Sequence, residues 1–268
     1  MNKLFKIFEL KNKLAIVSGA TGYLGSVICE TLAKLGSNII LIDNFSTEKK
    51  LKKTTYNFKK KYPKQSFFYY HCDFENNNNK IELIKKLKKF KKIDILINNA
   101  CYNGPKNGKG YLESFKNQNL KTWKSCFEIN LSTIFEITKA LHPNLKKSKS
   151  ASIINIASIY GVYGPDWNIY KGTNLSNPAA YAASKGGLIQ LTKWMSKTMG
   201  PEIRVNAISP GGIYRKQPKK FVKAYIEKTS LNRMAVENDF IGVVTLLASS
   251  ASDYITGQNI IVDGGWGS

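Results

Sequence analysis

The chain has few of the residues that most often build metal centres and disulfide frameworks. Its 268 residues include four cysteines and two histidines. The cysteines show no C-x-x-C spacing, and neither histidine has neighbours at metal-ligand spacing. The sequence therefore predicts no metal site, and it predicts reduced, unpaired thiols of the kind found in the cytosol.

Long apolar runs are also absent. No run reaches the roughly 18 residues needed to span a bilayer. The segment 1–10 carries charges inside its apolar stretch and has no small-residue cleavage site, so it does not match a secretory signal. We therefore expect a cytoplasmic protein that does not enter a membrane. A hydrophobic content of 43% fits one large α/β domain over residues 1–268 better than two domains.

Arginine is rare, although the formal net charge is +23. Only Arg204, Arg215 and Arg233 are arginines, so lysine supplies nearly all of the positive charge. Proteins that read nucleic acid use arginine for bidentate base contacts and aromatic side chains for stacking, so we expect no nucleic-acid partner. Two explanations of the lysine excess stay open. It is either a compositional bias, seen also in the abundant asparagine and isoleucine, or a means of attracting an anionic substrate.

Short apolar runs alternate with amphipathic stretches along the chain. This alternation predicts an α/β fold with a doubly wound parallel sheet, right-handed crossovers and helices on both faces. The apolar runs predict strands at 14–17, 38–42, 66–70, 93–97, 152–157, 203–208 and 260–262. The amphipathic stretches predict helices up to about residue 35 and at 47–62, 80–90, 121–142 and 179–199.

Glycines 19, 22 and 25 directly follow the first expected strand and open the helix after it. A turn without side chains lets the backbone approach a pyrophosphate at the positive N-terminus of that helix. Asp43 ends the second expected strand, 18 residues after Gly25. A carboxylate there accepts hydrogen bonds from the hydroxyls of an adenosine ribose and repels a 2′-phosphate. The pattern predicts a dinucleotide cofactor, with NAD preferred over NADP.

Tyr181 and Lys185 lie four residues apart in an expected helix, so their side chains share one face. The pKa of a free phenol is about 10, and a neighbouring cation favours the phenolate and lowers that pKa. The pair therefore indicates an acid/base. Two polar residues accompany it: Ser158 follows the strand expected at 152–157, and Asn130 lies in the helix expected at 121–142.

These motifs, in this order, resemble those of the classical short-chain dehydrogenase/reductase family. The resemblance runs from about residue 14 to the end, and it includes Asn98-Asn99-Ala100-Cys101, where cysteine replaces the family's glycine. It implies a Rossmann-type fold and an NAD(P)-dependent oxidoreductase that interconverts a secondary alcohol and a ketone. It also implies a homodimer or homotetramer, with the helices at 121–142 and 179–199 packing against their two-fold mates. One departure is the G-x-x-G-x-x-G spacing, which belongs to the family's extended branch.

The resemblance assigns a role to each catalytic residue. Tyr181 would exchange a proton with the substrate oxygen, and Lys185 would hold the nicotinamide ribose and lower the pKa of Tyr181. Ser158 would donate a hydrogen bond to the reacting oxygen, and Asn130 would anchor a water that links Lys185 to solvent. The implied cofactor-binding residues are Gly19, Thr21, Gly22, Tyr23, Leu24, Gly25, Asp43, Asp73, Phe74, Asn99, Ala100, Tyr181, Lys185, Pro210, Gly211 and Ile213.

Two segments, at about 159–180 and 211–235, are expected to form the substrate side. The first is longer than in most of the family, and its aromatic and amide side chains suit a polar, hydroxyl-rich ligand. Lys171, Arg215 and Lys216 either bind an anionic group of the substrate or are solvated surface charges. The first segment, together with the stretches 209–218 and 256–266, also resembles those of flagellin-modification dehydrogenases, which are associated with bacterial surface-sugar synthesis. We therefore expect a sugar or sugar phosphate as substrate.

Two other functions fit parts of the pattern. The glycine spacing and the Asp43-Asn44 pair fit an extended-branch nucleotide-sugar epimerase or dehydratase. Those enzymes carry an added C-terminal substrate domain, whereas this chain ends five residues after Asp263. The other alternative is a non-catalytic dinucleotide sensor. The presence of the full catalytic set, Ser158, Tyr181, Lys185 and Asn130, argues against it.

Overall fold

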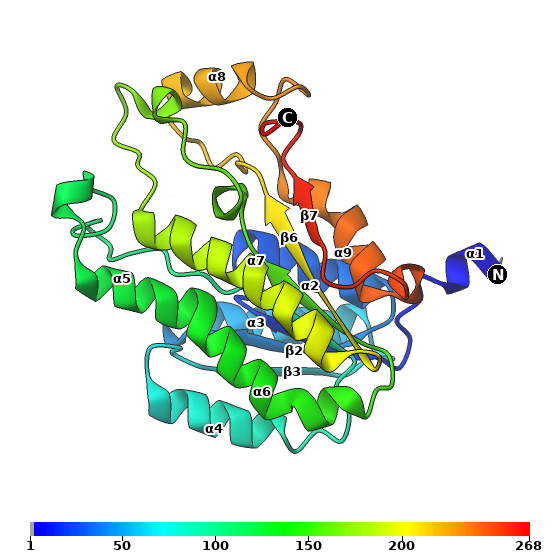
Figure 1. The fold of residues 1–268 in the computed structure, drawn as a ribbon. Helices are drawn as coiled ribbons and strands as arrows, with labels where there is room; N and C mark the ends of the chain where they lie inside the picture. Colours follow the sequence, from blue (N-terminus) through cyan, green and yellow to red (C-terminus); the bar gives the residue numbers. More distant parts are fainter. Residues whose placement is uncertain (1–2) are drawn as a thin grey trace.

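The structure is a computed structural model that describes residues 3–268 of the chain. Its strands form one parallel sheet in the order β3-β2-β1-β4-β5-β6-β7 (Figure 1). This confirms the doubly wound sheet of a Rossmann-type fold. The strands are β1 (Leu14–Ser18), β2 (Asn38–Asp43), β3 (Phe67–His71), β4 (Ile95–Asn98), β5 (Ala151–Ile156), β6 (Ile203–Pro210) and β7 (Asn259–Val262).

Helices connect the strands and cover both faces of the sheet (Figure 1). A short helix, α1, precedes the first strand at the right of the figure. The helices are α1 (Lys3–Lys6), α2 (Tyr23–Lys34), α3 (Glu48–Lys61), α4 (Asn77–Leu87), α5 (Leu120–Phe127), α6 (Thr133–Lys146), α7 (Ala179–Met199), α8 (Lys219–Glu227) and α9 (Ile241–Ala248).

The helices form two layers, and each layer packs on one face of the sheet through its own hydrophobic core. One core packs α2, α3 and α9 on one face of the sheet and buries side chains such as Ile28, Phe58 and Val244. The other packs α4, α6 and α7 on the opposite face and buries side chains such as Leu141 and Met195. The sheet is therefore covered on both sides, as a parallel sheet requires.

The first strand shows why these runs are continuously apolar. Ala15 and Val17 face one core, while Ile16 between them faces the other. In the parallel ladder Ile16 lies opposite Ile40 of β2 and Leu96 of β4. Because both faces of the strand are buried, a polar residue at any of these positions would lose its hydration without gaining a partner.

Three helical segments differ from the expectation. The helix expected at 121–142 is interrupted by a π-helical turn, Glu128–Ser132, between α5 and α6. The helix α9 was not predicted because its residues are almost all apolar, and a short apolar run does not distinguish helix from buried strand. The helix α8 lies within the segment 211–235, which was expected only as a substrate loop.

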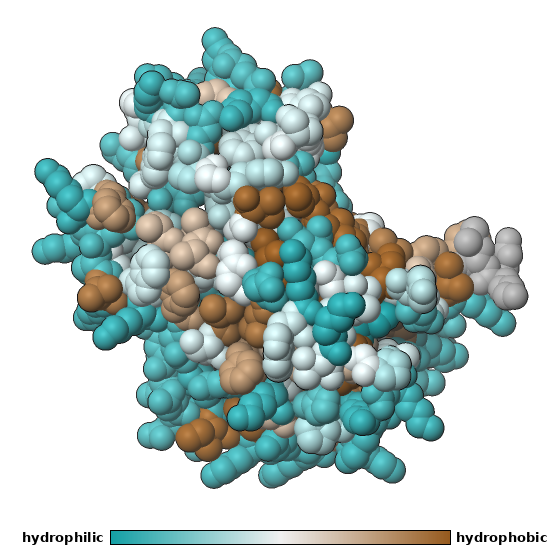
Figure 2. All heavy atoms as spheres, in the orientation of Figure 1, coloured by the Kyte–Doolittle hydropathy of each residue, from teal (hydrophilic) through white to brown (hydrophobic). Residues whose placement is uncertain are grey.

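On the face of the molecule seen in Figure 2, hydrophilic side chains lie around the edge and apolar residues gather towards the middle. Within residues 3–268, no helix is both long and apolar enough to cross a bilayer. All four cysteines are free thiols. In the described part of the chain, no group of three or more histidine, cysteine or carboxylate side chains has an arrangement that would hold a metal ion.

Candidate active site

A cleft of about 1050 Å³ opens along the carboxyl ends of the strands. Its walls come mainly from the residues that follow β1, β2, β3, β4, β5 and β6. In the strand order, connections run outward in opposite directions from β1 and β4, and ligands of open α/β sheets bind at this switch point. The cleft is therefore where the fold places a ligand site.

The glycine turn forms one wall of the cleft and depends on close backbone packing. Gly19 has a φ of +62°, a conformation that side chains disfavour. A Cβ on Gly25 would lie only 2.0 Å from the Gly19 carbonyl oxygen. Gly22 caps the start of α2, which begins at Tyr23. The N-terminus of this helix thus faces the cleft without intervening side chains, as a pyrophosphate site requires.

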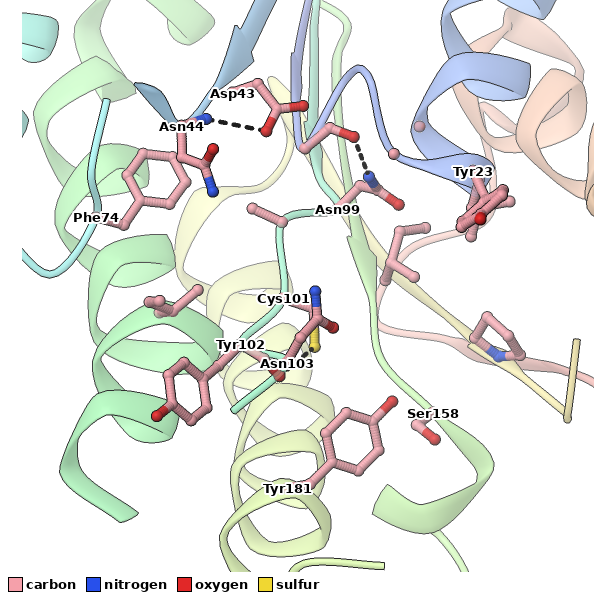
Figure 3. A pocket seen from close by; sticks show the side chains of 18 of the residues that line it. Tyr23, Asp43, Asn44, Phe74, Asn99, Cys101, Tyr102, Asn103, Ser158 and Tyr181 are labelled. Carbon is pink, nitrogen blue, oxygen red and sulfur yellow. Dashed lines mark hydrogen bonds between the residues drawn. The ribbon is translucent and has the colours of Figure 1, made fainter. Parts of the chain in front are cut away.

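Asp43 lies at the end of β2 and braces the glycine turn. Its Oδ2 accepts hydrogen bonds from the Thr21 backbone N–H at 2.8 Å and from the Thr21 hydroxyl at 2.7 Å. Its Oδ1 accepts one hydrogen bond, from the Asn44 backbone N–H at 2.9 Å, and lines the cleft (Figure 3). A carboxylate oxygen can accept more than one hydrogen bond, so Oδ1 retains capacity for a ribose hydroxyl.

Asn99 ties the end of β4 to the same turn. Its side-chain amide donates to the backbone carbonyls of Ser18 and Gly19, at 3.0 and 3.1 Å. Figure 3 marks one of these hydrogen bonds. The backbone N–H groups of Asn99 and Ala100 donate to the Ser18 hydroxyl. Four hydrogen bonds therefore fix the floor of the cleft between β1 and β4.

Tyr181 and Ser158 meet at the opposite end of the cleft. Tyr181 lies in the first turn of α7, and Figure 3 shows its hydroxyl pointing toward Ser158, which follows β5. Ser158 is buried, and its hydroxyl accepts a hydrogen bond from the Tyr160 backbone N–H at 3.2 Å. Two hydroxyl groups from different elements thus converge on one point of the cleft wall.

Burial raises the pKa of Tyr181 above its ordinary value, with the neighbouring Cys101 thiol acting in the same direction. The hydrogen bond with Ser158 lowers that pKa, but burial outweighs it. Because the phenol keeps its proton at neutral pH, Tyr181 is set up as a proton donor in the cofactor-free protein. This differs from the expected depression of its pKa by Lys185.

The position of Lys185 explains in part why the pKa of Tyr181 is raised and not lowered as expected. Its ammonium is buried and donates a hydrogen bond to the Ile156 carbonyl at 2.7 Å. It lies over the Tyr181 ring, 5.8 Å from the ring centroid. The ammonium therefore lies next to the aromatic ring of Tyr181, and both residues line the cleft.

The shape and polarity of the cleft fit a nicotinamide dinucleotide. The glycine turn and the start of α2 suit the pyrophosphate, and the free side of Asp43 suits the adenosine ribose. Lys185 and Tyr181 lie at the far end, where the nicotinamide half would reach. All of the expected cofactor-binding residues line this cleft: Gly19, Thr21, Gly22, Tyr23, Leu24, Gly25, Asp43, Asp73, Phe74, Asn99, Ala100, Tyr181, Lys185, Pro210, Gly211 and Ile213.

Comparison with known proteins supports the same assignment. A family model described as enoyl-(acyl carrier protein) reductase matches residues 19–267. The chain belongs to the short-chain dehydrogenase/reductase family. A solved short-chain dehydrogenase from Leptospira borgpetersenii with bound NAD+ is 30% identical, with a TM-score of 0.81, covering 99% of this chain and 96% of that chain.

Two curated relatives have different names and roles. A 3-oxoacyl-(acyl-carrier-protein) reductase of Thermotoga maritima is 33% identical over 192 residues, which cover 69% of this chain and 70% of that protein. The post-translational flagellin modification protein A of Campylobacter coli is 28% identical over 260 residues, covering 96% of this chain and 99% of that protein. This short-chain dehydrogenase is therefore an oxidoreductase that uses a nicotinamide dinucleotide, with relatives among the flagellin-modification proteins.

Asn130 lies beneath the cleft and does not line it. It is fully buried in the π-helical turn, where its amide oxygen accepts from the Tyr102 backbone N–H at 2.8 Å. Its amide nitrogen donates to the Ser184 hydroxyl at 3.0 Å, and Ser184 in turn donates to the Tyr181 carbonyl. Asn130 therefore supports the first turn of α7. Its expected role in holding a water stays a prediction.

The three basic residues expected at the substrate lie in different surroundings. Arg215 lines the cleft, but its guanidinium pairs with Glu237 at 2.7 Å and lies over the Tyr23 ring, 4.4 Å from its centroid. Lys171 and Lys216 are exposed and lie outside the cleft lining. The structure thus brings only Arg215 to the site, and the substrate role of all three stays a prediction.

Several cleft residues were not predicted from the sequence. Tyr102 and Asn103 directly follow the Asn-Asn-Ala-Cys run, so their place after a strand end was a usable signal. Lys106 and Tyr160 also line the cleft. Lys50, in a lysine-rich helix with no distinguishing pattern, reaches the adenosine half and donates to the Thr21 carbonyl.

We predict that Gly25→Ala lowers the thermal stability and weakens NADH binding by about tenfold or more, a difference of about 1.4 kcal/mol. The new methyl group would meet a backbone oxygen, which no side-chain movement can relieve. Gly242→Ala in α9 is the matched control, because a Cβ there meets nothing within 4 Å. Thermal unfolding and NADH fluorescence titration measure both effects. Unchanged NADH affinity in Gly25→Ala would contradict the glycine-turn assignment.

Proposed function

We propose that the protein is an NAD-dependent oxidoreductase that interconverts a secondary alcohol and a ketone on a sugar or sugar phosphate. We place the reaction in the cytoplasm, in the synthesis of bacterial surface glycans or flagellin modifications. The observation that carries the chemistry is the convergence of the Tyr181 and Ser158 hydroxyls beside the buried ammonium of Lys185. These residues line the same cleft as the glycine turn.

The bound dinucleotide supplies hydride transfer, and the side chains manage the proton. In the reduction direction, the Tyr181 phenol donates its proton to the carbonyl oxygen, which becomes the alcohol oxygen. Ser158 donates a hydrogen bond to the same oxygen, where negative charge develops. In the oxidation direction Tyr181 must first be a phenolate. Since burial raises its pKa, oxidation is expected to speed up as the pH rises, while reduction proceeds at neutral pH.

The preference for NAD rests on Asp43. Its Oδ1 is placed to accept from a ribose hydroxyl, and its negative charge would repel the phosphate of NADP. Lys50 lies on the same wall and acts in the opposite sense, because an ammonium attracts phosphate. We propose that the effect of Asp43 on cofactor preference outweighs that of Lys50, because Asp43 is the last residue of β2.

The substrate class rests on the polar lining and on the relatives. Tyr102, Asn103, Lys106 and Tyr160 line the same cleft as the catalytic hydroxyls and offer hydrogen-bonding groups to a polyhydroxy ligand. The Campylobacter coli flagellin modification protein matches nearly the whole chain. We propose that the segments 159–180 and 211–235 cover this half of the cleft in a single-domain protein.

A 3-oxoacyl thioester is the second candidate substrate, because the Thermotoga maritima relative is a 3-oxoacyl-(acyl-carrier-protein) reductase. An absorbance assay of NADH formation and consumption separates the two. The panel should contain neutral sugars, sugar phosphates, sugar acids and a 3-oxoacyl thioester. Turnover of the thioester above every sugar would contradict the sugar assignment and leave the oxidoreductase chemistry intact.

We further propose a homodimer or homotetramer. Three adjacent helices carry exposed apolar side chains. These are Leu120 and Trp123 on α5, Phe135 on α6 and Trp194 on α7. An apolar surface of this kind on adjacent helices suits a contact between subunits. Light scattering that reports a monomer of 30.1 kDa at micromolar concentration would contradict the assembly.

Tyr181→Phe should lower turnover by about 10²–10⁴-fold while the dissociation constant for NADH changes little, because only the proton-transferring hydroxyl is removed. The matched control is Tyr111→Phe, which deletes the hydroxyl of another buried tyrosine outside the cleft lining. Steady-state rates and NADH titration on both variants test the mechanism. Turnover of Tyr181→Phe within a few fold of the wild type would be incompatible with it.

Asp43→Asn should shift the ratio of kcat/KM for NAD over NADP towards NADP by about tenfold or more, since a hydrogen bond to a charged group contributes about 1.5–3 kcal/mol. Asparagine keeps an acceptor for Thr21, so the brace of the glycine turn survives better than in Asp43→Ala. Initial rates with both cofactors give the ratio. A wild-type enzyme that already prefers NADP would refute the role of Asp43.

A further inference from the structure

Arg215 lies against the start of α2, at the glycine turn. Its guanidinium lies over the ring of Tyr23, 4.4 Å from the ring centroid. Tyr23 is the first residue of α2 and directly follows Gly22 of the glycine turn. Figure 3 shows Tyr23 well apart from Tyr181 and Ser158, which lie at the other end of the cleft. The arginine that the sequence suggested for the substrate is therefore next to the wall that suits a pyrophosphate.

Glu237 holds the guanidinium without being part of the cleft wall. Among the described residues, Arg215 lines the cleft and Glu237 does not. The Arg215 Nη1 atom pairs with a Glu237 carboxylate oxygen at 2.7 Å and donates to the Tyr214 carbonyl at 2.8 Å. Within residues 3–268, both of these polar contacts involve Nη1. A guanidinium has five N–H donors, so donors on Nε and Nη2 stay available to a ligand.

The start of α2 favours an anion in the same place. Gly22, the N-cap residue, has no side chain, and the first turn of the helix holds no acidic residue. The N–H groups of a first helical turn carry partial positive charge, so this end of the helix attracts an anion and disfavours a lone cation. A diphosphate placed here would accept hydrogen bonds both from the helix N–H groups and from the guanidinium.

We propose that Arg215 binds the pyrophosphate of the dinucleotide cofactor, in place of the substrate role expected from the sequence. The proposal rests on the proposed oxidoreductase site but not on the identity of its substrate. Glu237 and Tyr23 hold the guanidinium in position, and its planar fork matches two oxygens of a phosphate group. Lysine has the charge without the fork, so it should replace Arg215 only in part.

Equilibrium binding, without turnover, tests this role. In Arg215→Ala, the dissociation constants of NADH and ADP should rise about tenfold, because each loses a charge-assisted hydrogen bond to phosphate. The dissociation constant of adenosine, which has no phosphate, should change by less than about twofold, because that hydrogen bond is not made. Arg215→Lys should give a rise of about threefold for NADH and ADP. Fluorescence titration measures NADH binding, and displacement of bound NADH measures ADP and adenosine.

Arg233→Ala is the matched control. It removes the same charge from an arginine that also pairs with a carboxylate, Asp239 at 2.7 Å, but that lies outside the cleft lining. All three dissociation constants should stay at their wild-type values. The Arg215 side chain is 27% exposed, so the difference between Arg215→Ala and the wild type should shrink as salt is added.

Equal NADH and ADP affinity in Arg215→Ala and the wild type would overturn the proposal. So would normal NADH affinity together with a raised KM for a charged substrate, which would assign Arg215 to the substrate. An equal loss of adenosine affinity would also count against it, because the effect would then not depend on phosphate. If Arg215→Ala does not fold, Arg215→Lys decides by the same comparison. A wild-type protein that binds no NADH would instead overturn the proposed function itself.

Discussion

Close backbone packing at the glycine turn is the constraint on which the rest of the site depends. Gly25 approaches the Gly19 carbonyl so closely that no side chain fits between them. Asn99 and Asp43 then fasten the ends of β4 and β2 to this turn through hydrogen bonds. Because the strands are parallel, their carboxyl ends meet here. The fixed turn thereby sets where a dinucleotide lies relative to the residues that follow β5 and begin α7.

At the catalytic end of the cleft, the pKa of Tyr181 depends on the balance between burial and its polar contacts. Burial disfavours the phenolate of Tyr181 and the Ser158 hydroxyl favours it, and burial prevails in the cofactor-free protein. Lys185 donates one hydrogen bond to the Ile156 carbonyl, and its ammonium lies over the Tyr181 ring, 5.8 Å from the ring centroid. Tyr181 is therefore a buried, protonated acid, and a bound cofactor would change its charge environment.

The sequence predicted the parts of the site that local patterns determine. Strand ends, the glycine turn and the Tyr181–Lys185 spacing depend on short-range periodicity, and their residues all line the cleft. Arg215 shows where this reasoning stops. Its pairing with Glu237 and its contact with Tyr23 join segments far apart in the chain, which no spacing rule reveals. The same holds for α9, whose apolar residues carry no helical period.

The central claim is that a buried Tyr181 phenol works as the acid/base beside a nicotinamide dinucleotide. Ultraviolet titration of phenolate, taken as the difference between the wild type and Tyr181→Phe, measures its pKa directly. The account predicts a titration midpoint above the value of about 10 for free tyrosine in the cofactor-free protein, because burial disfavours the charge. It also predicts a lower midpoint with NAD+, whose positive ring favours the phenolate. A midpoint below that of free tyrosine without cofactor, and unchanged by NAD+, would contradict the account.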